Sequence, residues 1–287
     1  MTDRAYAMRM LSRALGYRTA AACTVAAALV CVALTGGASQ AQEGTVVPVD
    51  RALCDNMKRH HVIKAGAPVG CKRLKLVRFS YLGFDGQVHG DGEIMVMDAA
   101  ADSVARIFAR LREMGFPVAK ARLIDNYEGN DDASLADNNT SAFNFRNVAG
   151  TSSLSLHAYG LAIDLNPLQN PYVQHSGAGL VYSPPAGAAY ADRLKGQPEK
   201  RLRLGLAEAV IDPFADEGFL VWGGTWKTSI DYQHFQVSRG LAQQLARMAP
   251  AEANAVFRQH VERYRTCRGK GGPESSRSNC VALDGPP

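Results

Sequence analysis

The stretch SLHAYGLAID, residues 155–164, places His157 seven positions ahead of an aspartate that follows an apolar run. The apolar residues on both sides of Asp164 predict a buried strand over residues 161–165. Burying an ionised carboxylate without a partner is costly, and a divalent metal ion supplies the compensation. The imidazole of His157 is a second ligand of suitable softness for zinc, and Gly160 permits a tight turn between the two ligands. This segment therefore predicts part of a zinc site.

A second segment, DYQHF at residues 231–235, supplies the third ligand. His234 lies in an aromatic and apolar run that predicts another strand. Three protein ligands leave one coordination position for water, which is typical of catalytic zinc. Asp231 is the nearest group that can accept the proton of that water. Strict alternation along a strand would put Asp231 and His234 on opposite faces, so we expect Asp231 at the start of the strand or at a bulge.

The two segments together form the pattern S-x-H-x-x-G-x-A-x-D followed by D-x-x-H. This pattern resembles the LAS-type zinc peptidases, which are the D-alanyl-D-alanine carboxypeptidases and L-alanyl-D-glutamate endopeptidases of bacterial cell walls. The resemblance covers roughly residues 79–236 and includes NTSAFNFR at 139–146 and WGGTW at 222–226, which are similar to VanY-like members. It implies zinc as the cofactor and peptidoglycan stem peptides as the substrate.

The resemblance also implies a role for each site residue. The three zinc ligands would be His157, Asp164 and His234, the general base would be Asp231, and the positive group that polarises the scissile carbonyl and stabilises its oxyanion would be Arg146. Without the family, an arginine in a polar loop is normally solvated or paired with a carboxylate. The role of Ser155 stays open. The aspartate before x-x-H resembles the endopeptidases, whereas the VanY-like segments favour a carboxypeptidase, which is the activity we expect.

The N-terminus has the features of a secretory signal. Four arginines precede an apolar run at residues 20–34, and ASQA at 38–41 offers small residues to a signal peptidase. The alternative is a single membrane anchor, but this run of about 15 residues is shorter than the roughly 20 that span a bilayer. We predict a signal peptide over residues 1–41 and a secreted mature chain, periplasmic or extracellular, without a membrane span.

Loss of the signal peptide would remove most of the basic character of the chain. The formal net charge falls from +5 to +2, because 28 basic and 26 acidic residues remain once four Arg and one Asp are removed. No stripe of Lys and Arg with interleaved aromatic residues is left, so the sequence does not favour nucleic-acid binding.

The mature chain keeps an even number of cysteines, which in an oxidising compartment predicts two disulfides. These are Cys54, Cys71, Cys267 and Cys280. Of the three possible pairings we favour Cys54 with Cys71 and Cys267 with Cys280, because each closes a short loop near one chain end. A zinc site built from the four is the alternative, but the close C-x-x-C spacing of such sites is missing.

Hydrophobic periodicity predicts an α+β fold, a single domain with a small antiparallel sheet that carries the zinc site and is flanked by helices. Besides the strand that bears Asp164, we expect strands at 92–97, 119–124, 219–222 and 232–237, helices at 102–114, 201–217, 240–248 and 251–264, and irregular loops at 125–151 and 166–191. Within 201–217, Asp212-Pro213 suggests a break or a new helix start. Asp98 or Asp102 is expected to cap the first helix.

The predicted organisation along the chain has four parts. They are a signal peptide (1–41), a disulfide-stapled N-terminal extension (42–78), a zinc peptidase domain (79–266), and a C-terminal tail (267–287) that is mobile apart from its local disulfide. The oligomeric state is not predicted.

Two other functions are compatible with parts of this pattern. The first is a zinc-bound binding module without activity, as in the hedgehog signalling domain, whose fold is similar. An intact Asp231 and Arg146 argue against it, because a site that has lost activity needs neither. The second is a structural domain held by disulfides, in which Asp164 and His234 pair with one another and no metal binds.

Overall fold

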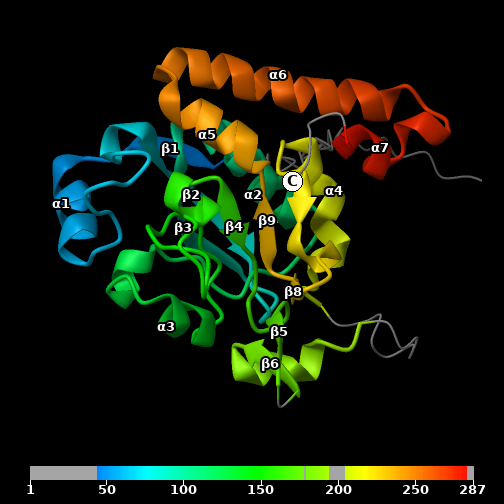
Figure 1. The fold of residues 1–287 in the computed structure, drawn as a ribbon, viewed down its shortest axis with the longest axis horizontal. Helices are drawn as coiled ribbons and strands as arrows, with labels where there is room; N and C mark the ends of the chain where they lie inside the picture. The colour runs from blue at the N-terminus through cyan, green and yellow to red at the C-terminus, as the bar shows by residue number, and fades with distance from the viewer. Residues whose placement is uncertain (1–43, 178, 194–203, 283–287) are drawn as a thin grey trace, which may run out of the picture. The chain divides into compact units, whose positions relative to one another are not determined.

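The computed structural model describes residues 44–177, 179–193 and 204–282, all within one compact unit, Ser39–Pro287. The signal peptide predicted for residues 1–41 lies outside the described residues. None of the described helices has the length and apolar character needed to cross a membrane. The fold is α+β, as predicted, but its strands form three small antiparallel sheets instead of one (Figure 1).

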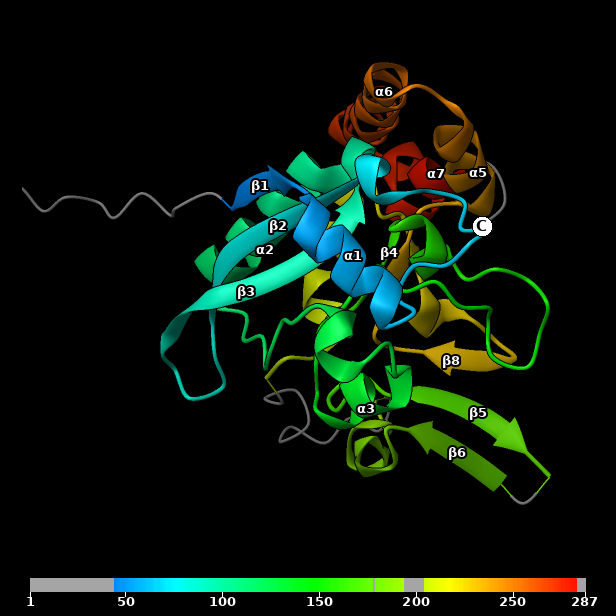
Figure 2. The same cartoon turned by 90° about the vertical axis from the view of Figure 1, so that its left-hand side faces the viewer.

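The first sheet has the order β1-β2-β3 and comprises Thr45–Pro48, Leu74–Leu82 and Val88–Met97. Its last strand confirms the strand predicted at 92–97. Helix α2 (Ala101–Glu113) packs against β2, and the apolar face predicted for it is buried. Figure 2 shows the three strands side by side with α2 next to them. Because β1 pairs with β2, the N-terminal extension contributes an edge strand to this sheet.

The second sheet has the order β4-β9-β7, with strands Ala162–Asp164, His234–Gln236 and Val221–Trp222. All three confirm predicted strands, although each is shorter than the apolar run that indicated it. Ile163 and Phe235 face one another across β4 and β9 and are fully buried. This small sheet therefore runs through the core.

The third sheet has the order β6-β5-β8, with strands Gly179–Ser183, Tyr172–Ser176 and Ser229–Asp231. The prediction of an irregular loop at 166–191 was therefore wrong. Prolines suggested the loop, yet Pro171 lies just before β5 and Pro184 just after β6. Proline is compatible with strand ends, where no ladder hydrogen bond is lost.

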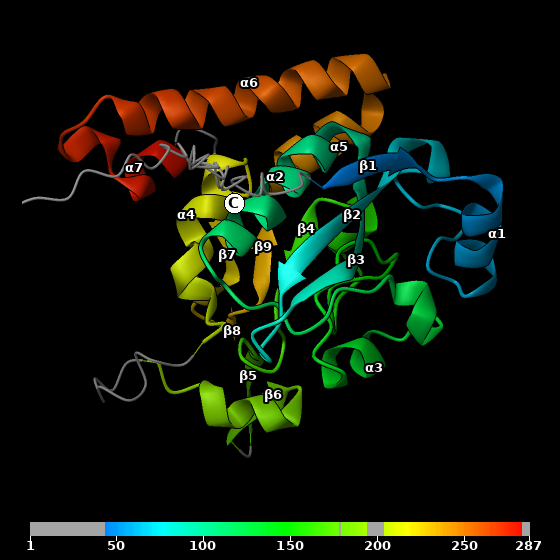
Figure 3. The same ribbon diagram turned by 180° about the vertical axis from the view of Figure 1, so that it is seen from behind.

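Helices surround the sheets. The α-helices besides α2 are α1 (Arg51–Arg59), α3 (Asp131–Ala136), α4 (Ile211–Asp216), α5 (Arg239–Arg247), α6 (Pro250–Gly269) and α7 (Arg277–Ala282). Among the described residues, the 3₁₀ helices are η1 (Cys71–Arg73), η2 (Asp98–Ala100), η3 (Ile124–Tyr127), η4 (Leu156–Tyr159), η5 (Pro185–Tyr190), η7 (Ala207–Val210), η8 (Gly223–Thr225) and η9 (Pro273–Ser275). The two predicted C-terminal helices are confirmed as α5 and α6. The long α6 packs against α4, α5 and α7 (Figure 3). In the region predicted as helical at 201–217, η7 is followed directly by the short α4, which begins at Ile211, next to the predicted break at Asp212-Pro213. Residues 201–203 lie outside the described part.

The prediction of a strand at 119–124 was wrong. Asparagine side chains form several of the backbone hydrogen bonds that a strand would make with its neighbours. The amide of Ala119 donates to Asn166 Oδ1 at 2.9 Å. The amide of Arg122 donates to Asn139 Oδ1, and the Asn139 side chain donates back to the Arg122 carbonyl. The only ladder contact left is a single bridge from Ala121 to Thr140.

The expected side-chain cap of α2 is also absent. Ala100 is the N-cap, and Asp98 instead forms a buried ion pair with Arg73, at 2.8 Å between Oδ2 and Nε. The same guanidinium donates to the carbonyls of Leu245 and Met248 at the end of α5. Asp98 therefore connects three distant segments, which is a tertiary role that local spacing does not indicate.

Substituting Asp98→Asn should lower the free energy of unfolding by about 2–4 kcal/mol, because it leaves the Arg73 guanidinium buried without its counter-charge. Urea unfolding followed by circular dichroism measures this loss. Glu113→Gln is the control, since it removes an exposed ion pair of α2 whose expected contribution is about 0–1 kcal/mol. Equal stability losses in the two variants would contradict the structural role of Asp98.

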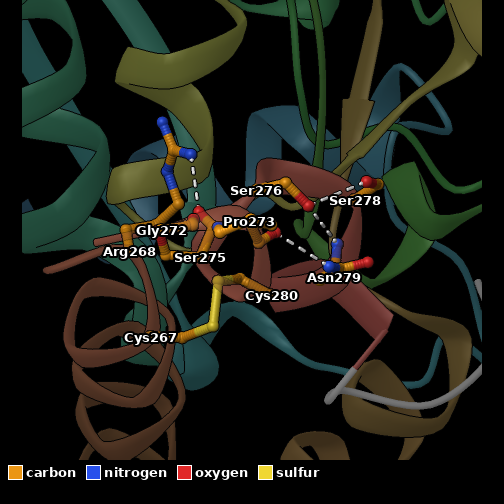
Figure 4. Close-up of a disulfide and its surroundings, with 9 residues drawn as sticks. All are labelled: Cys267, Arg268, Gly272, Pro273, Ser275, Ser276, Ser278, Asn279 and Cys280. Atoms are coloured by element: carbon orange, nitrogen blue, oxygen red, sulfur yellow. Dashed lines mark hydrogen bonds between the residues drawn. A yellow bond between two sulfur atoms is a disulfide. The ribbon is translucent and has the colours of Figure 1, made fainter. Parts of the chain in front are cut away.

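The two favoured disulfides are present. Cys54 pairs with Cys71, and Cys267 pairs with Cys280. Figure 4 shows the second one joining the end of α6 to α7, where Arg268 donates to the Ser275 carbonyl at 2.9 Å. The tail is therefore folded as far as residue 282, which corrects the prediction of a mobile segment. Residues 283–287 lie outside the described part.

Candidate metal and catalytic site

Asp164 and His234 are direct partners in the β4–β9 ladder. Residues opposite one another in an antiparallel pair project their side chains from the same face. His234 Nδ1 lies 2.9 Å from Asp164 Oδ1, although 70 residues separate the two along the chain. The sheet thus brings together the two segments that the sequence singled out.

His157 reaches the same point from η4 (Leu156–Tyr159), whose N-cap is Ser155 and whose C-cap is Gly160. Ser155 Oγ accepts the amide hydrogen of His157 and so caps this turn. His157 Nε2 lies 3.0 Å from Asp164 Oδ2. The three side chains are almost completely buried, and their potential ligand atoms all lie within 4.8 Å of one another.

Gly160 adopts a left-handed backbone with φ of 67°, and a Cβ there would lie only 2.6 Å from the Met97 amide nitrogen. Gly160→Ala should therefore shift η4 and lower the free energy of unfolding by more than the roughly 1–2 kcal/mol of a left-handed alanine alone. Gly150→Ala is the matched control, because its φ is 73° and nothing lies within 4 Å of the added carbon. Thermal unfolding measures the stability of both variants. Equal losses of stability would show that the close approach of residue 160 to Met97 is unimportant.

In each histidine, the ring nitrogen that points away from Asp164 has a hydrogen-bond acceptor. His157 Nδ1 lies 2.5 Å from the carbonyl oxygen of Ala142, which can only accept, so Nδ1 carries the proton and Nε2 of the neutral ring has a lone pair. His234 Nε2 lies 2.8 Å from Gln236 Oε1, which in the same way leaves a lone pair on Nδ1 of the neutral ring. When both rings are neutral, two ring lone pairs and a carboxylate face one another, which is an arrangement that a bound cation stabilises.

Electrostatics favour a positive charge at this point. Burial raises the pKa of Asp164, but the charges of His157 and His234 and the hydrogen bonds from their rings outweigh it and hold the pKa well below its usual range. Burial lowers the pKa of His234, but the hydrogen bond and charge of Asp164 outweigh it and raise the pKa. The two nitrogens and one oxygen thus have the chemistry, burial and proximity of a zinc site.

Asp231 ends β8, and a turn of two residues separates it from His234 at the start of β9. Asp231 therefore precedes the strand of His234, as the alternation argument required. Its Oδ2 lies 4.0 Å from His234 Nδ1, and its Oδ1 is buried without a hydrogen-bond partner in the described part of the chain. Burial raises the pKa of Asp231 to about 7, with His234 opposing the rise and the charge of Asp164 adding to it.

Arg146 lies in the long polar segment beside this cluster. Its Nε is 3.1 Å from Asp131 Oδ2, and its Nη2 is 3.9 Å from Asp164 Oδ2. Together with Asp231 and His234, Arg146 and Asp164 line one cleft of about 460 Å³. The structure thus brings the five predicted site residues together: four of them line the cleft, and His157 contacts one of these, Asp164.

Several further residues line or support the site. Trp226 lines the cleft with its ring 5.4 Å from that of His234, whereas Trp222 is buried and donates its indole N–H to the Tyr232 carbonyl. Asp131 and Gln236, which position Arg146 and His234, were not identified. The sequence could have indicated Gln236 as a partner of His234, since it lies two residues after His234 on the same face of a strand.

Comparison with known proteins gave one match. Residues 149–237 match a family model described as D-alanyl-D-alanine carboxypeptidase. The matched segment contains both halves of the sequence pattern, whereas Arg146 precedes it by three residues. Neither the curated proteins nor the solved structures gave a match.

Proposed function

Building on the LAS-type zinc peptidase resemblance, which the family match supports, we propose that this chain is a zinc-dependent peptidase of peptidoglycan stem peptides. We infer that it acts as a D-alanyl-D-alanine carboxypeptidase and that residues 79–266 form its catalytic domain. The observation that carries this proposal is the buried His-Asp-His cluster with a further carboxylate, Asp231, 4.0 Å from a ligand nitrogen in the same cleft.

In this proposal His157 and Asp164, from the first segment, and His234, from the second, hold the metal. Zinc, when bound, would act as a Lewis acid that polarises the scissile carbonyl and acidifies water. The protein orients the ligands through the Ala142 carbonyl and the Gln236 side chain, which fix the tautomers of the two rings.

Asp231 is the proposed general base and acid. Its Oδ1 has no hydrogen-bond partner among the residues that the structure describes and can therefore take a proton from the attacking water. It returns that proton to the amine that leaves, as the same carboxyl can serve both steps. The proposed role of Arg146 is to stabilise the negative charge that develops on the carbonyl oxygen, and its ion pair with Asp131 holds it in place for this.

We also propose that the protein acts outside the cytoplasm, after removal of residues 1–41. Two disulfides in the described part of the chain are compatible with an oxidising compartment. Cell-wall peptides are accessible from that side of the membrane, so location and substrate agree.

Digestion of purified peptidoglycan, followed by mass spectrometry of the released products, tests this function. Loss of the terminal D-alanine is the expected result, and Asp231→Asn serves as the inactive control. Newly freed D-glutamate amines would instead identify an L-alanyl-D-glutamate endopeptidase and overturn the carboxypeptidase assignment. If neither product appears with zinc-loaded protein, the peptidase proposal is wrong.

A further inference from the structure

A second arginine lines the cleft and has no carboxylate partner in the described part of the chain. Arg239 is the first residue of α5, a helix capped by Ser238. Its Nη1 donates to the Leu154 carbonyl at 2.9 Å, which fixes the guanidinium against the segment just before η4. No ion pair or further hydrogen bond engages the remaining nitrogens of Arg239 within the residues that the structure covers.

The two cleft arginines differ in what already neutralises them. Arg146 is paired with Asp131 at 3.1 Å and faces Asp164 at 3.9 Å. Arg239 has neither contact, so its charge is the uncompensated positive charge of the cleft wall. It lies at the N-terminal end of a helix, where the backbone amides add to the positive potential.

Arg239, together with Arg146 and the proposed metal, would offset the negative charges of the cleft for an anionic ligand. Asp131, Asp132, Asp164 and Asp231 all line the cleft and would repel a substrate carboxylate. A guanidinium can bind a carboxylate through two parallel N–H donors. With Nη1 held by Leu154, Nε and Nη2 of Arg239 are left for that contact, and the side chain loses less conformational freedom on binding.

We propose that Arg239 forms a carboxylate-binding subsite that determines which stem peptides this enzyme accepts. The inference rests on the proposed function, because it assigns the substrate group that this cleft recognises. Stem peptides offer that group in two places, the C-terminal carboxylate of the last D-alanine and the α-carboxylate of the D-glutamate residue. Arg239 acts on substrate binding, so its loss raises KM and leaves kcat nearly unchanged.

The test uses zinc-loaded protein and two pairs of synthetic stem peptides. One pair ends in D-alanine as the carboxylate or as the carboxamide, and the other contains D-glutamate or its amidated form at the second position. Arg239→Gln should raise KM by about 10- to 100-fold for the peptide that carries the recognised carboxylate, as expected for a lost charged hydrogen bond. For the amidated peptide of the same pair, which lacks that carboxylate, Arg239→Gln should change KM by less than about 3-fold.

Arg247→Gln is the matched control, because Arg247 is an exposed arginine at the other end of α5 and does not line the cleft. It should leave KM for all four peptides unchanged. Arg239→Lys keeps the charge without the two-pronged geometry and should show an intermediate KM. Thermal unfolding of each variant separates a binding defect from a folding defect.

Calorimetric binding of the same peptides to Asp231→Asn separates this inference from the proposed function. If the peptides bind through a carboxylate and this binding needs Arg239, but the wild type does not hydrolyse them, the proposed function is rejected and the subsite is supported. Hydrolysis in which Arg239→Gln keeps the full preference for both carboxylates would support the function and overturn the subsite.

Discussion

Asp231→Asn should reduce the kcat of peptide hydrolysis by about 10²- to 10⁴-fold while the protein keeps its zinc. The amide has nearly the shape of the carboxylate but cannot accept a proton at neutral pH. Asp231 lies outside the ligand cluster, with 4.0 Å between its Oδ2 and His234 Nδ1, so metal affinity should change little. Steady-state kinetics on a D-Ala-D-Ala peptide, together with the zinc content of the same sample, measure both quantities.

Asp102→Asn is the control for this experiment, because it removes an exposed carboxylate in the first turn of α2 and should leave kcat unaltered. A fully active Asp231→Asn variant would show that another group accepts the proton. Loss of zinc together with activity would show that Asp231 belongs to the ligand set, which contradicts its assignment as the base.

Asp164→Asn should abolish both zinc binding and hydrolysis. The carboxylate is 2% exposed and lies between the two imidazoles, so the variant loses a ligand and places an amide where negative charge is required. Zinc affinity should fall by more than the roughly 10- to 100-fold that loss of an outer hydrogen-bond partner costs. Titration with a competing chelator measures the affinity.

Gln236→Ala provides the graded comparison, because it removes only the partner of His234 Nε2 and should lower zinc affinity by about 10- to 100-fold. Excess zinc should restore peptide hydrolysis by Gln236→Ala and by chelator-treated wild type, but not by Asp164→Asn. Wild-type zinc affinity in Asp164→Asn would contradict the proposed ligand set, and circular dichroism checks that each variant is folded.

Local patterns correctly predicted the strands and helices whose apolar residues pack on the core. The apolar alternation around Asp164 and His234 indicated β4 and β9, and the helical spacing after Asp98 indicated α2. The strand expected at 119–124 failed because asparagine side chains distant in sequence, such as Asn166, take its backbone hydrogen bonds. Such competition depends on tertiary contacts and has no local signature.

The same limit applies to the site. The pattern identified His157, Asp164 and His234 because each is a polar residue in an apolar setting that needs a partner. Asp131 and Arg239 lie in polar or helical surroundings where a charge needs no explanation. Only the folded chain shows that Asp131 neutralises one cleft arginine and that the other has no carboxylate partner among the described residues.

The zinc content of the purified mature protein tests the central claim most directly. Elemental analysis after extensive dialysis should find about one zinc per chain, as expected for a site with three protein ligands, and its removal by a chelator should abolish peptide hydrolysis. A folded protein that binds no zinc would contradict this account, and the contact of Asp164 with His234 would then be a structural ion pair without a metal.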